Sequence, residues 1–569
     1  MSETVLMEAI DPALLSILSG LACHVVLNRF ELQNPLCLII LFIAVPIGLG
    51  SLLWRGSSNI ANIIFASATY LGTLSFSVIL YRLSPIHPLW AYPGPVASKI
   101  TKLYSAIISQ SGKQHLFYRQ LHEQYGDVVR VGPNELAFFT ADAIEPMFGS
   151  AGLPKGSFWD GRAGFQQQNR PMVAIYEKKD HSARRRKWQR AFTPAALKVY
   201  EPLIMKRVTE FVDTLERQPQ PVNLCRRIAY FADRTNAIDD RSWDFMFDLA
   251  YGGGSTVMQH GDVSGMLRLQ DVIQRSHMPW LGGLCYFAAN IIPSRVSKFR
   301  GWAIGVAANR VREGSAYRDI FYHVADEGNK SKEKPAFAEV VADGVLAVTA
   351  GSDTTSTVLS VVFYLLLSNP TSYQRLQEEI DNRGDRLLEF KAQADMPYLN
   401  AVINEAMRLV PTVPTGSHRQ VRKSSQAKMI AGSFVPLGTQ TFIPQYTLFH
   451  DKRYFSPLPD SFVPERWLPE EDRIRLEPAI FTNSADPYIL NRAAFIPFSH
   501  GPENCVGKQL ACMEMRMFVC AVLQRFDLRF AAGWDPKEWE DGLRGYFNVV
   551  KGKMPVIVHE RQGRASSQD

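Results

Sequence analysis

The chain has 569 residues, of which 46% are hydrophobic, so it contains ample apolar material for one large domain or two ordinary ones. Its formal net charge of +7 is modest and by itself selects neither nucleic acid, anionic lipid nor an acidic protein as a partner. The seven cysteines are odd in number and form no C-x-x-C pair, which argues against a disulfide framework and favours a reducing compartment.

Three uncharged apolar stretches predict that residues 1–82 form a membrane-anchor region. The stretch 36–54 has 19 residues, which at about 1.5 Å per residue nearly span a hydrocarbon core of roughly 30 Å. A second stretch lies at 60–81 and a weaker third at 12–28, so the number of spans, from one to three, stays open. One or two of these stretches are alternatively interfacial or buried helices. The acidic start does not fit a cleaved signal peptide.

Positive charges collect directly after the last apolar stretch, at Arg82, Lys99 and Lys102. By the positive-inside rule, this bias predicts that the large domain faces the cytosol. Residues 83–95 (LSPIHPLWAYPGP) are rich in proline, which fixes φ and removes hydrogen-bond donors, so we expect a stiff hinge there. The globular domain is expected to occupy residues 96–560, followed by a polar tail at 561–569.

The globular part has mostly helical periodicity, with apolar residues three and four apart and only short strand-like runs. We therefore expect a mainly α fold with small β-sheets. One helical segment, residues 181–192 (HSARRRKWQRAF), carries a dense basic run. A basic run of this kind is commonly a solvated helix face.

The stretch 336–368 predicts a buried helix, because it is apolar on all sides. It contains the polar sequence AGSDTT at 350–355, with Asp353 and Thr354 at its centre. Polar groups in such a helix need a partner or a purpose, since unpaired ones are costly to bury. A threonine can bond the carbonyl of residue i−4 and loosen the helix, which opens space for a small ligand. A kink with satisfied hydroxyls is the alternative.

Two further motifs precede the C-terminal region. Glu405 and Arg408 are three residues apart, so they share a helix face and can form an ion pair. Arg466 lies further on, in the sequence PERW at 464–467. The arginine side chains can fork to a carboxylate and still reach a second partner. An E-x-x-R pair alone is weak evidence, and its position about a hundred residues before a cysteine loop strengthens it.

The cysteine loop is the sequence FSHGPENCVGK at 498–508, in which Gly501 and Gly507 flank Cys505. Glycine lets a backbone approach a flat ligand closely. A helix-favouring run follows at once, so Cys505 is expected at a helix N-terminus, where the backbone N–H groups favour the thiolate. A buried cysteine is otherwise usually a small hydrophobic side chain.

Taken together, these motifs resemble the cytochrome P-450 superfamily, whose haem-binding signature reads F-x-x-G-x-R-x-C-x-G. The resemblance runs from about Tyr92 to roughly residue 555. It implies the cytochrome P-450 fold, a microsomal and fungal type of enzyme, and a location in the endoplasmic reticulum membrane. The departure is Glu503, which stands where most members place a basic residue near a haem propionate. This departure puts propionate anchoring at position 503 in doubt, but not the role of Cys505.

The resemblance assigns roles to the other residues of the four motifs. Cys505 would be the axial ligand of haem b, and a thiolate ligand favours O–O cleavage. Asp353 and Thr354 would relay protons to dioxygen, beside an oxygen site widened at Gly351. The haem contacts would come from Arg185, Phe498, Gly501, Gly507 and, with weaker support, Arg419. The triad of Glu405, Arg408 and Arg466 would be architectural.

The implied reaction is insertion of one atom of dioxygen into a lipophilic organic substrate. Electrons would come from NADPH through a membrane flavoprotein reductase, with cytochrome b5 as a second donor and no nucleic acid partner. The basic residues beside Arg185 would face the proximal surface and meet the acidic electron donor. The leader resembles fungal members of the family, many of which act in secondary metabolism, on terpenoids for example.

Substrate recognition in the family falls on segments without a shared motif, which here are 157–176 and 242–293. Both are apolar and aromatic, which suits a lipophilic substrate. Their aromatic side chains are Phe158, Trp159, Phe165, Trp280, Tyr286 and Phe287.

Two other functions remain as alternatives. One is a haem-thiolate isomerase or dehydratase that needs no reductase, and the other is a non-catalytic membrane haem protein. Retention of Asp353 and Thr354 counts against both.

Overall fold

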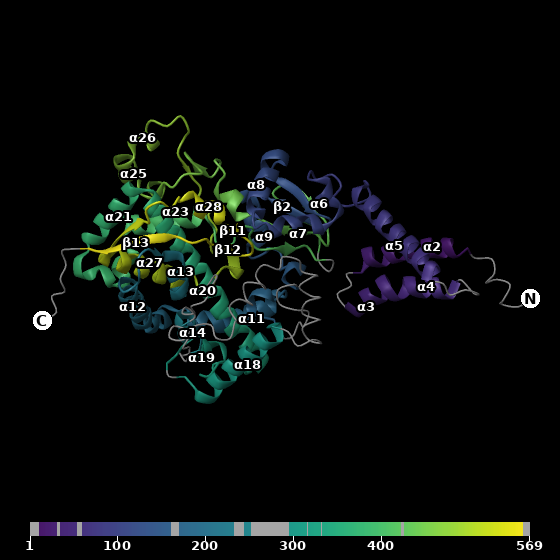
Figure 1. The fold of residues 1–569 in the computed structure, drawn as a ribbon, viewed down its shortest axis with the longest axis horizontal. Coiled ribbons are helices and arrows are strands. Elements are labelled where there is room, and N and C mark those ends of the chain that lie inside the picture. Colours follow the sequence, from purple (N-terminus) through teal and green to yellow (C-terminus); the bar gives the residue numbers. More distant parts are fainter. Residues whose placement is uncertain are drawn as a thin grey trace, which may run out of the picture. The chain divides into compact units, whose positions relative to one another are not determined.

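The structure is a computed structural model that describes residues 11–30, 35–53, 60–160, 170–232, 244–251, 295–315, 317–331, 333–422 and 426–561. The contacts of the chain divide it into two compact units (Figure 1). The first comprises Met1–Ser105 and Arg130–Glu135, and the second comprises Ala106–Val129 and Leu136–Asp569. Each unit is described separately below.

The first unit begins with three apolar helical stretches, which coincide with those expected from the sequence. They are α2 (Pro12–Arg29), the run formed by α3 (Pro35–Ile39), a π-helical turn and α4 (Val45–Leu53), and α5 (Ile60–Leu83). The helices α2 and α4 pack on α5, where Cys23, Tyr70 and Leu74 are buried. Many large apolar side chains of these helices stay exposed, among them Val25, Ile43, Ile60, Ile64 and Phe76.

Two helices in the described part of the chain are long and apolar enough to cross a membrane, α5 and α20 (Phe337–Ser368). The two differ in burial: the apolar window of α5 is 17% buried and that of α20 is 67% buried. Since protein surrounds most of α20, its apolar side chains belong to the core of the second unit and do not require a membrane.

The proline-rich stretch 83–95 belongs to the first unit and is held by Arg130, a residue of strand β1 (Val128–Gly132). The Arg130 guanidinium is buried and donates to the carbonyls of Arg82 at 3.0 Å and Pro133 at 2.9 Å. At Gly94, φ is +150° and a Cβ would lie 2.3 Å from the Arg130 carbonyl oxygen, so only glycine fits. The helix α6 (Val96–Ile100) follows.

The second unit is mainly helical with small sheets, as the periodicity predicts. Its principal helices are α8 (Gln114–Tyr125), α9 (Ile144–Phe148), α11 (Lys178–Ala191), α12 (Pro194–Glu216), α13 (Leu224–Ala232), α14 (Asp244–Tyr251), α18 (Arg295–Glu313), α19 (Ile320–Val324), α21 (Pro370–Asp381), α22 (Phe390–Ala394), α23 (Pro397–Leu409), α24 (Gln445–Phe449), α25 (Glu470–Leu476), α26 (Pro478–Phe481), α27 (Lys508–Arg525) and α28 (Lys537–Gly542). The helix α7 (Lys102–Gln110) begins in the first unit and ends in the second.

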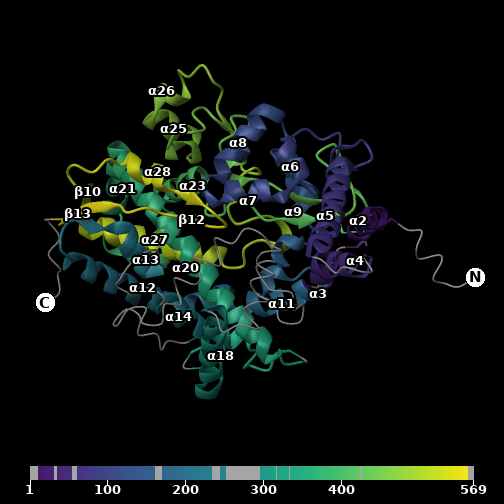
Figure 2. The ribbon, with the colours of Figure 1, turned by 45° about the vertical axis from the view of Figure 1, so that its right-hand side comes forward.

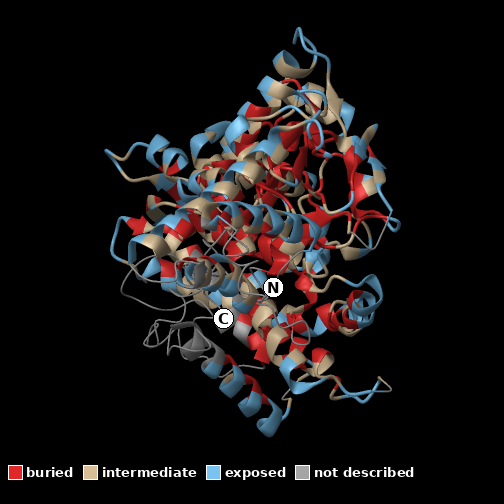
Figure 3. Ribbon diagram, turned by 90° about the vertical axis from the view of Figure 1, so that its right-hand side faces the viewer, coloured by how far each residue is buried: buried red, intermediate tan, exposed pale blue. Residues whose placement is uncertain are grey.

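The central element of the second unit is α20, which packs against α13, α14, α23 and α27 (Figures 1 and 2). Colouring by burial shows the interior of this unit in red and its outer helix faces in blue (Figure 3). Several hydroxyl groups of α20 are satisfied within the helix: Thr354 donates to the Ala350 carbonyl at 2.8 Å and Ser360 to the Ser356 carbonyl at 2.8 Å. This local bonding allows polar residues to occupy a buried helix.

The strands are short and form small sheets, and one of them carries Arg419. The strand β4 (Arg419–Gln420) pairs antiparallel with β7 (Gln440–Phe442), and β7 adjoins β2 (Glu135–Phe138). A second sheet has the order β10 (Phe526–Phe530), β13 (Pro555–Glu560) and β3 (Val222–Asn223). The short pairs are β5 (Lys428–Ile430) with β6 (Ser433–Val435), β8 (Phe455–Ser456) with β9 (Ile489–Leu490), and β11 (Arg544–Gly545) with β12 (Val549–Val550).

Candidate active site

The cysteine loop places Cys505 just before α27, which begins at Lys508 after Gly507. The Cys505 N–H donates to the Phe498 carbonyl at 2.8 Å and closes the loop. At Gly501, φ is +71° and a Cβ would lie 2.0 Å from the Phe148 carbonyl oxygen, so this position requires glycine. Gly507 has φ −84°, and a Cβ there would make only ordinary contacts. The two glycines therefore differ: Gly501 sets the loop conformation, whereas Gly507 leaves room beside the thiol.

The Cys505 side chain is exposed at this loop, although protein surrounds it closely. Burial raises the pKa of the thiol above its ordinary value, and the backbone N–H groups of Gly507 and Lys508 together with the Arg185 guanidinium offset part of that rise. These groups favour the thiolate, as expected at a helix N-terminus. A thiol that is both accessible and close to positive charge is suited to bind a metal ion.

Arg185 joins α11 to the cysteine loop. Its guanidinium donates to the backbone carbonyl and to the side-chain oxygen of Asn504, each at 2.6 Å. Two other members of the basic run form ion pairs with carboxylates of the second unit. Arg184 is buried and pairs with Asp343 at 3.0 Å, and Arg190 pairs with Asp326 at 2.8 Å. The expectation that the whole run faces an electron donor is therefore wrong for Arg184, because its side chain is buried against Asp343.

The carboxylate of Glu503 lies between two cations. Lys155 Nζ is 2.8 Å and Arg419 Nη1 is 2.5 Å from Glu503 Oε2, and all three side chains are at most 8% exposed. Although burial raises it, Lys155 and Arg419 lower the pKa of Glu503 to about 2. The sequence signals Glu503 as a departure from the family pattern, but nothing local in the sequence points to Lys155.

Asp353 and Thr354 lie on α20 with different surroundings. The Asp353 carboxylate is buried, accepts from Asn548 Nδ2 at 2.5 Å and lies 3.8 Å from Lys551 Nζ. Thr354 is half-buried, with its hydroxyl on the Ala350 carbonyl. Gly351 faces the Met246 side chain, and a Cβ added at position 351 would lie 2.3 Å from Met246 Cε. The partners Asn548 and Lys551 flank the short strand β12 and were not identified by the sequence.

A second carboxyl group that the sequence did not single out links α20 to α27. Glu514 is buried, and its Oε2 accepts from the Thr355 hydroxyl at 3.3 Å. Burial raises the pKa of Glu514 well above its ordinary value. Its other oxygen has no hydrogen-bond partner within the described residues. Burial therefore favours the protonated form of Glu514, which lies close to the polar segment of α20.

Glu405, Arg408 and Arg466 form one fully buried ion-pair network. Arg408 Nη2 and Arg466 Nε lie 2.7 and 2.9 Å from Glu405 Oε1, and the Trp467 indole donates to the other carboxylate oxygen at 2.9 Å. The remaining guanidinium N–H groups donate to carbonyls at Phe449, Pro459, Ser461, Pro457 and Leu458. The network ties α23 to the loop that runs towards the cysteine.

Only part of the expected substrate-recognition region is within the described residues. Phe158 and Trp159 are buried, and Phe158 stacks on His418 with ring centroids 4.0 Å apart. Phe165, Trp280, Tyr286 and Phe287 lie outside the described residues.

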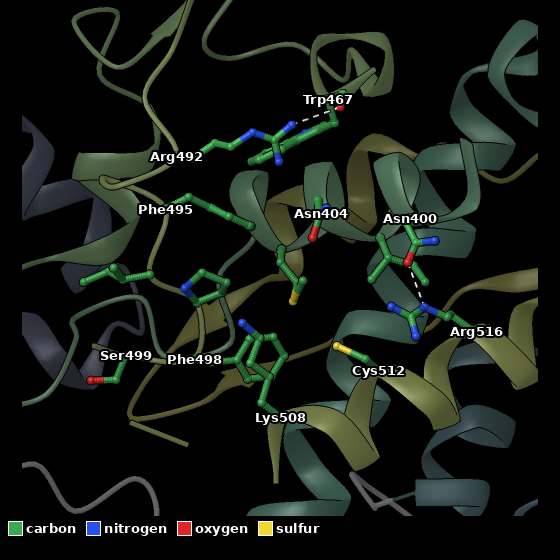
Figure 4. Close-up of a pocket in the computed structure, with 14 residues that line it drawn as sticks. Asn400, Asn404, Trp467, Arg492, Phe495, Phe498, Ser499, Lys508, Cys512 and Arg516 are labelled. Atoms are coloured by element: carbon green, nitrogen blue, oxygen red, sulfur yellow. Dashed lines mark hydrogen bonds between the residues drawn. The ribbon is translucent and has the colours of Figure 1, made fainter. Parts of the chain in front are cut away.

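A pocket of about 280 Å³ lies between α23, the cysteine loop and α27 (Figure 4). Arg492, Lys508 and Arg516 contribute positive charge to its lining, which contains no carboxylate. Figure 4 shows Arg492 bonded to the Trp467 carbonyl and Arg516 to Asn400. The pocket is thus suited to an acidic group.

The residues around Cys505 fit a haem group. An accessible thiol provides an iron ligand, and Lys155, Arg185 and Arg419 provide cations for carboxylates. The Nε of Arg419 is buried and has no hydrogen-bond partner among the described residues, so it remains available to an anion.

Comparison with known proteins gives a consistent result. Residues 311–553 match the Cytochrome P450 family. The chain is 30% identical to Cytochrome P450 67 of Uromyces fabae, over 86% of this chain and 90% of the relative. It is 30% identical to the cytochrome P450 monooxygenase nodW of Hypoxylon pulicicidum, over 82% and 81%. It is also 28% identical to the tryprostatin B 6-hydroxylase of Aspergillus fumigatus, over 87% and 84%. The expected family is confirmed: this chain belongs to the cytochrome P450 family, and its relatives' activity makes it a monooxygenase, an oxidoreductase.

Proposed function

We propose that this protein is a membrane-anchored haem-thiolate monooxygenase with Cys505 as the axial ligand of haem b. The observation that carries the proposal is the position of Cys505, accessible and directly before α27, with N–H groups and Arg185 favouring its thiolate. Haem bound there supplies dioxygen activation, with one oxygen atom entering the substrate and the other leaving as water.

The remaining site residues have supporting roles in this proposal. Asp353, held by Asn548 and Lys551, and Thr354 would hold and move protons beside the reacting oxygen. Arg185 and Arg419 would hold the haem carboxylates, Phe498 would pack in the cysteine loop, and Gly501 and Gly507 would shape that loop. The triad of Glu405, Arg408 and Arg466 would support the loop without touching the reactants.

The proposed electron source is NADPH through a membrane flavoprotein reductase. The cationic pocket beside the cysteine loop supports it, because Arg492 and Lys508 are exposed and positive next to the proposed ligand. Charge complementarity at such a surface mainly increases the rate of association.

The first unit supports attachment to the endoplasmic reticulum membrane, with the second unit in the cytosol. Helix α5 has 24 residues, which is about the length that a bilayer requires, and exposed apolar side chains along its surface. We further propose residues 83–95 as the hinge and 96–560 as the monooxygenase domain.

The proposed substrate is a lipophilic small molecule of fungal secondary metabolism. The buried side chains of Phe158 and Trp159, against which the partly buried Phe547 packs, support an apolar ligand. One relative is by name a hydroxylase of tryprostatin B, which supports hydroxylation as the reaction type.

The CO difference spectrum of dithionite-reduced protein in microsomes tests the proposal. We expect a band near the 450 nm that characterises a thiolate opposite CO, and its loss in Cys505→Ser. Cys512→Ser is the matched control, because Cys512 lies on α27 one turn beyond its start. A band near 420 nm in folded wild-type protein would overturn thiolate ligation. Consumption of NADPH and oxygen with added reductase then distinguishes a monooxygenase from an isomerase or a carrier.

A further inference from the structure

The buried charge cluster around Glu503 is built from segments far apart in the sequence. The backbone of Lys155 forms an antiparallel bridge with Arg419, so the two cationic side chains start side by side. Both reach the same oxygen of Glu503, at 2.8 and 2.5 Å. The exposed fractions of the Lys155 and Arg419 side chains are 4% and 3%. The Glu503 carboxylate thus holds the positive charges of Lys155 and Arg419 close together.

The cluster carries more positive than negative charge. Arg185 and His181 act electrostatically on the same group of residues. Burial and the nearby Lys155 lower the pKa of His181 to about 4, so it is neutral at physiological pH. Among the described residues, the cluster thus combines the cations Lys155, Arg185 and Arg419 with the single carboxylate of Glu503, which gives an excess of two positive charges. Buried charge without a partner is unfavourable, and Arg419 Nε also has no acceptor in the part of the chain that the structure describes.

We propose that Lys155, oriented by Glu503, is a haem-carboxylate ligand that acts together with Arg185 and Arg419. The inference rests on the proposed function, since it requires haem bound through Cys505. The two carboxylates of haem match the two uncompensated positive charges. Glu503 then positions Lys155 and Arg419 through its carboxylate. Lys155 supplies the positive charge that a basic residue at position 503 supplies in most members of the family. Lys155 is in this sense a cofactor-binding residue.

A purely structural role for Lys155 makes a different prediction. If Lys155 only neutralises Glu503, then Lys155→Gln harms haem binding because the Glu503 carboxylate keeps its pair with Arg419 and competes with the haem carboxylates for that guanidinium. Removing that carboxylate as well, in Lys155→Gln/Glu503→Gln, would restore haem binding. If Lys155 itself binds the haem carboxylate, the double variant stays defective, because the cation is still missing.

The experiment measures haem release from the purified full-length holoenzyme to excess apomyoglobin, followed by absorbance. We expect Lys155→Gln and the double variant to release haem at least about tenfold faster than wild type, since a charged hydrogen bond is lost. Lys155→Arg should release haem within about threefold of wild type, because it keeps the charge. The control Lys178→Gln should match wild type, because Lys178 Nζ donates to the Gly152 carbonyl at 2.6 Å and lies outside the cluster.

Release from the double variant at the wild-type rate would overturn the proposal. The double variant also remains informative if Lys155→Gln fails to fold, because it removes the negative charge of Glu503 together with the positive charge of Lys155. The CO difference spectrum distinguishes a failure of the Lys155 proposal from a failure of the proposed function. Wild type without a band near 450 nm would refute thiolate ligation, whereas an intact band with faster release concerns Lys155 alone.

Discussion

Glu405 and Glu503 are both buried carboxylates between two cations, and in both the cations lower the carboxyl pKa to about 2 despite burial. The surroundings of the cations differ. Around Glu405, the arginines use their remaining donors on backbone carbonyls, and no part of the network is exposed. Around Glu503, Arg419 Nε has no acceptor among the described residues. A saturated network stabilises the fold, whereas an unsaturated one retains capacity for a ligand.

The largest effect is expected from Glu405→Gln, because two buried guanidinium groups lose their carboxylate. The free energy of unfolding should fall by about 3–5 kcal/mol, measured by denaturant unfolding. Glu177→Gln is the control, since Glu177 is 69% exposed and pairs with Arg422 at 2.9 Å. That control should change stability by less than about 1 kcal/mol. Equal effects of the two substitutions would show that the triad is not a stabilising network.

Lowering the pH should remove the stabilisation that the ionised Glu405 carboxylate provides. The Glu405 pKa falls from 4.5 to about 2 in the folded state, so its contribution is complete above pH 4.5 and is lost as the pH falls towards 2. The shift corresponds to about 3 kcal/mol. Denaturant unfolding at about pH 6 and about pH 3 should therefore show a larger loss for wild type than for Glu405→Gln. Parallel losses in the two proteins would contradict the lowered pKa.

Gly501→Ala tests the loop that carries Glu503. A Cβ at positive φ, 2.0 Å from the Phe148 carbonyl oxygen, should lower the free energy of unfolding by about 1–3 kcal/mol. Gly507→Ala is the matched control, where φ is −84° and the added Cβ would be 3.7 Å from Phe192. It should cost less than about 1 kcal/mol. Thermal unfolding of both variants measures the difference, and a larger cost at Gly507 would contradict the loop geometry.

Thr354→Ala should have the smallest effect on stability, below about 1 kcal/mol, because its hydroxyl only bonds its own helix at 2.8 Å. We expect retained haem and CO binding, with product formed per NADPH falling by about tenfold or more. Thr349→Ala is the control, since that hydroxyl bonds the Leu346 carbonyl in the same helix. The measurement compares NADPH consumed with product formed, and an unchanged yield would rule out the proton-relay role.

Local sequence patterns predicted the helical class and several element positions. The apolar stretch 336–368 became the buried helix α20, and the cysteine loop precedes α27 as expected from the run that follows it. The three N-terminal stretches are helices. The family followed from the order and spacing of motifs, and the comparisons confirm it. The individual site assignments and the membrane anchor remain predictions. Periodicity and motif spacing are properties of neighbouring residues, so one sequence is enough to read them.

The tertiary structure decided which charged groups meet. The basic run 181–192 looked uniform in the sequence, yet Arg184 and Arg190 turn to buried carboxylates while Arg185 turns to the cysteine loop. Lys155 and Lys551 carry no local signal, and each lies beside a carboxylate from a distant segment. Ion pairs within a core depend on how helices and loops pack, and the cost of burying a charge selects those partners only once the chain has folded.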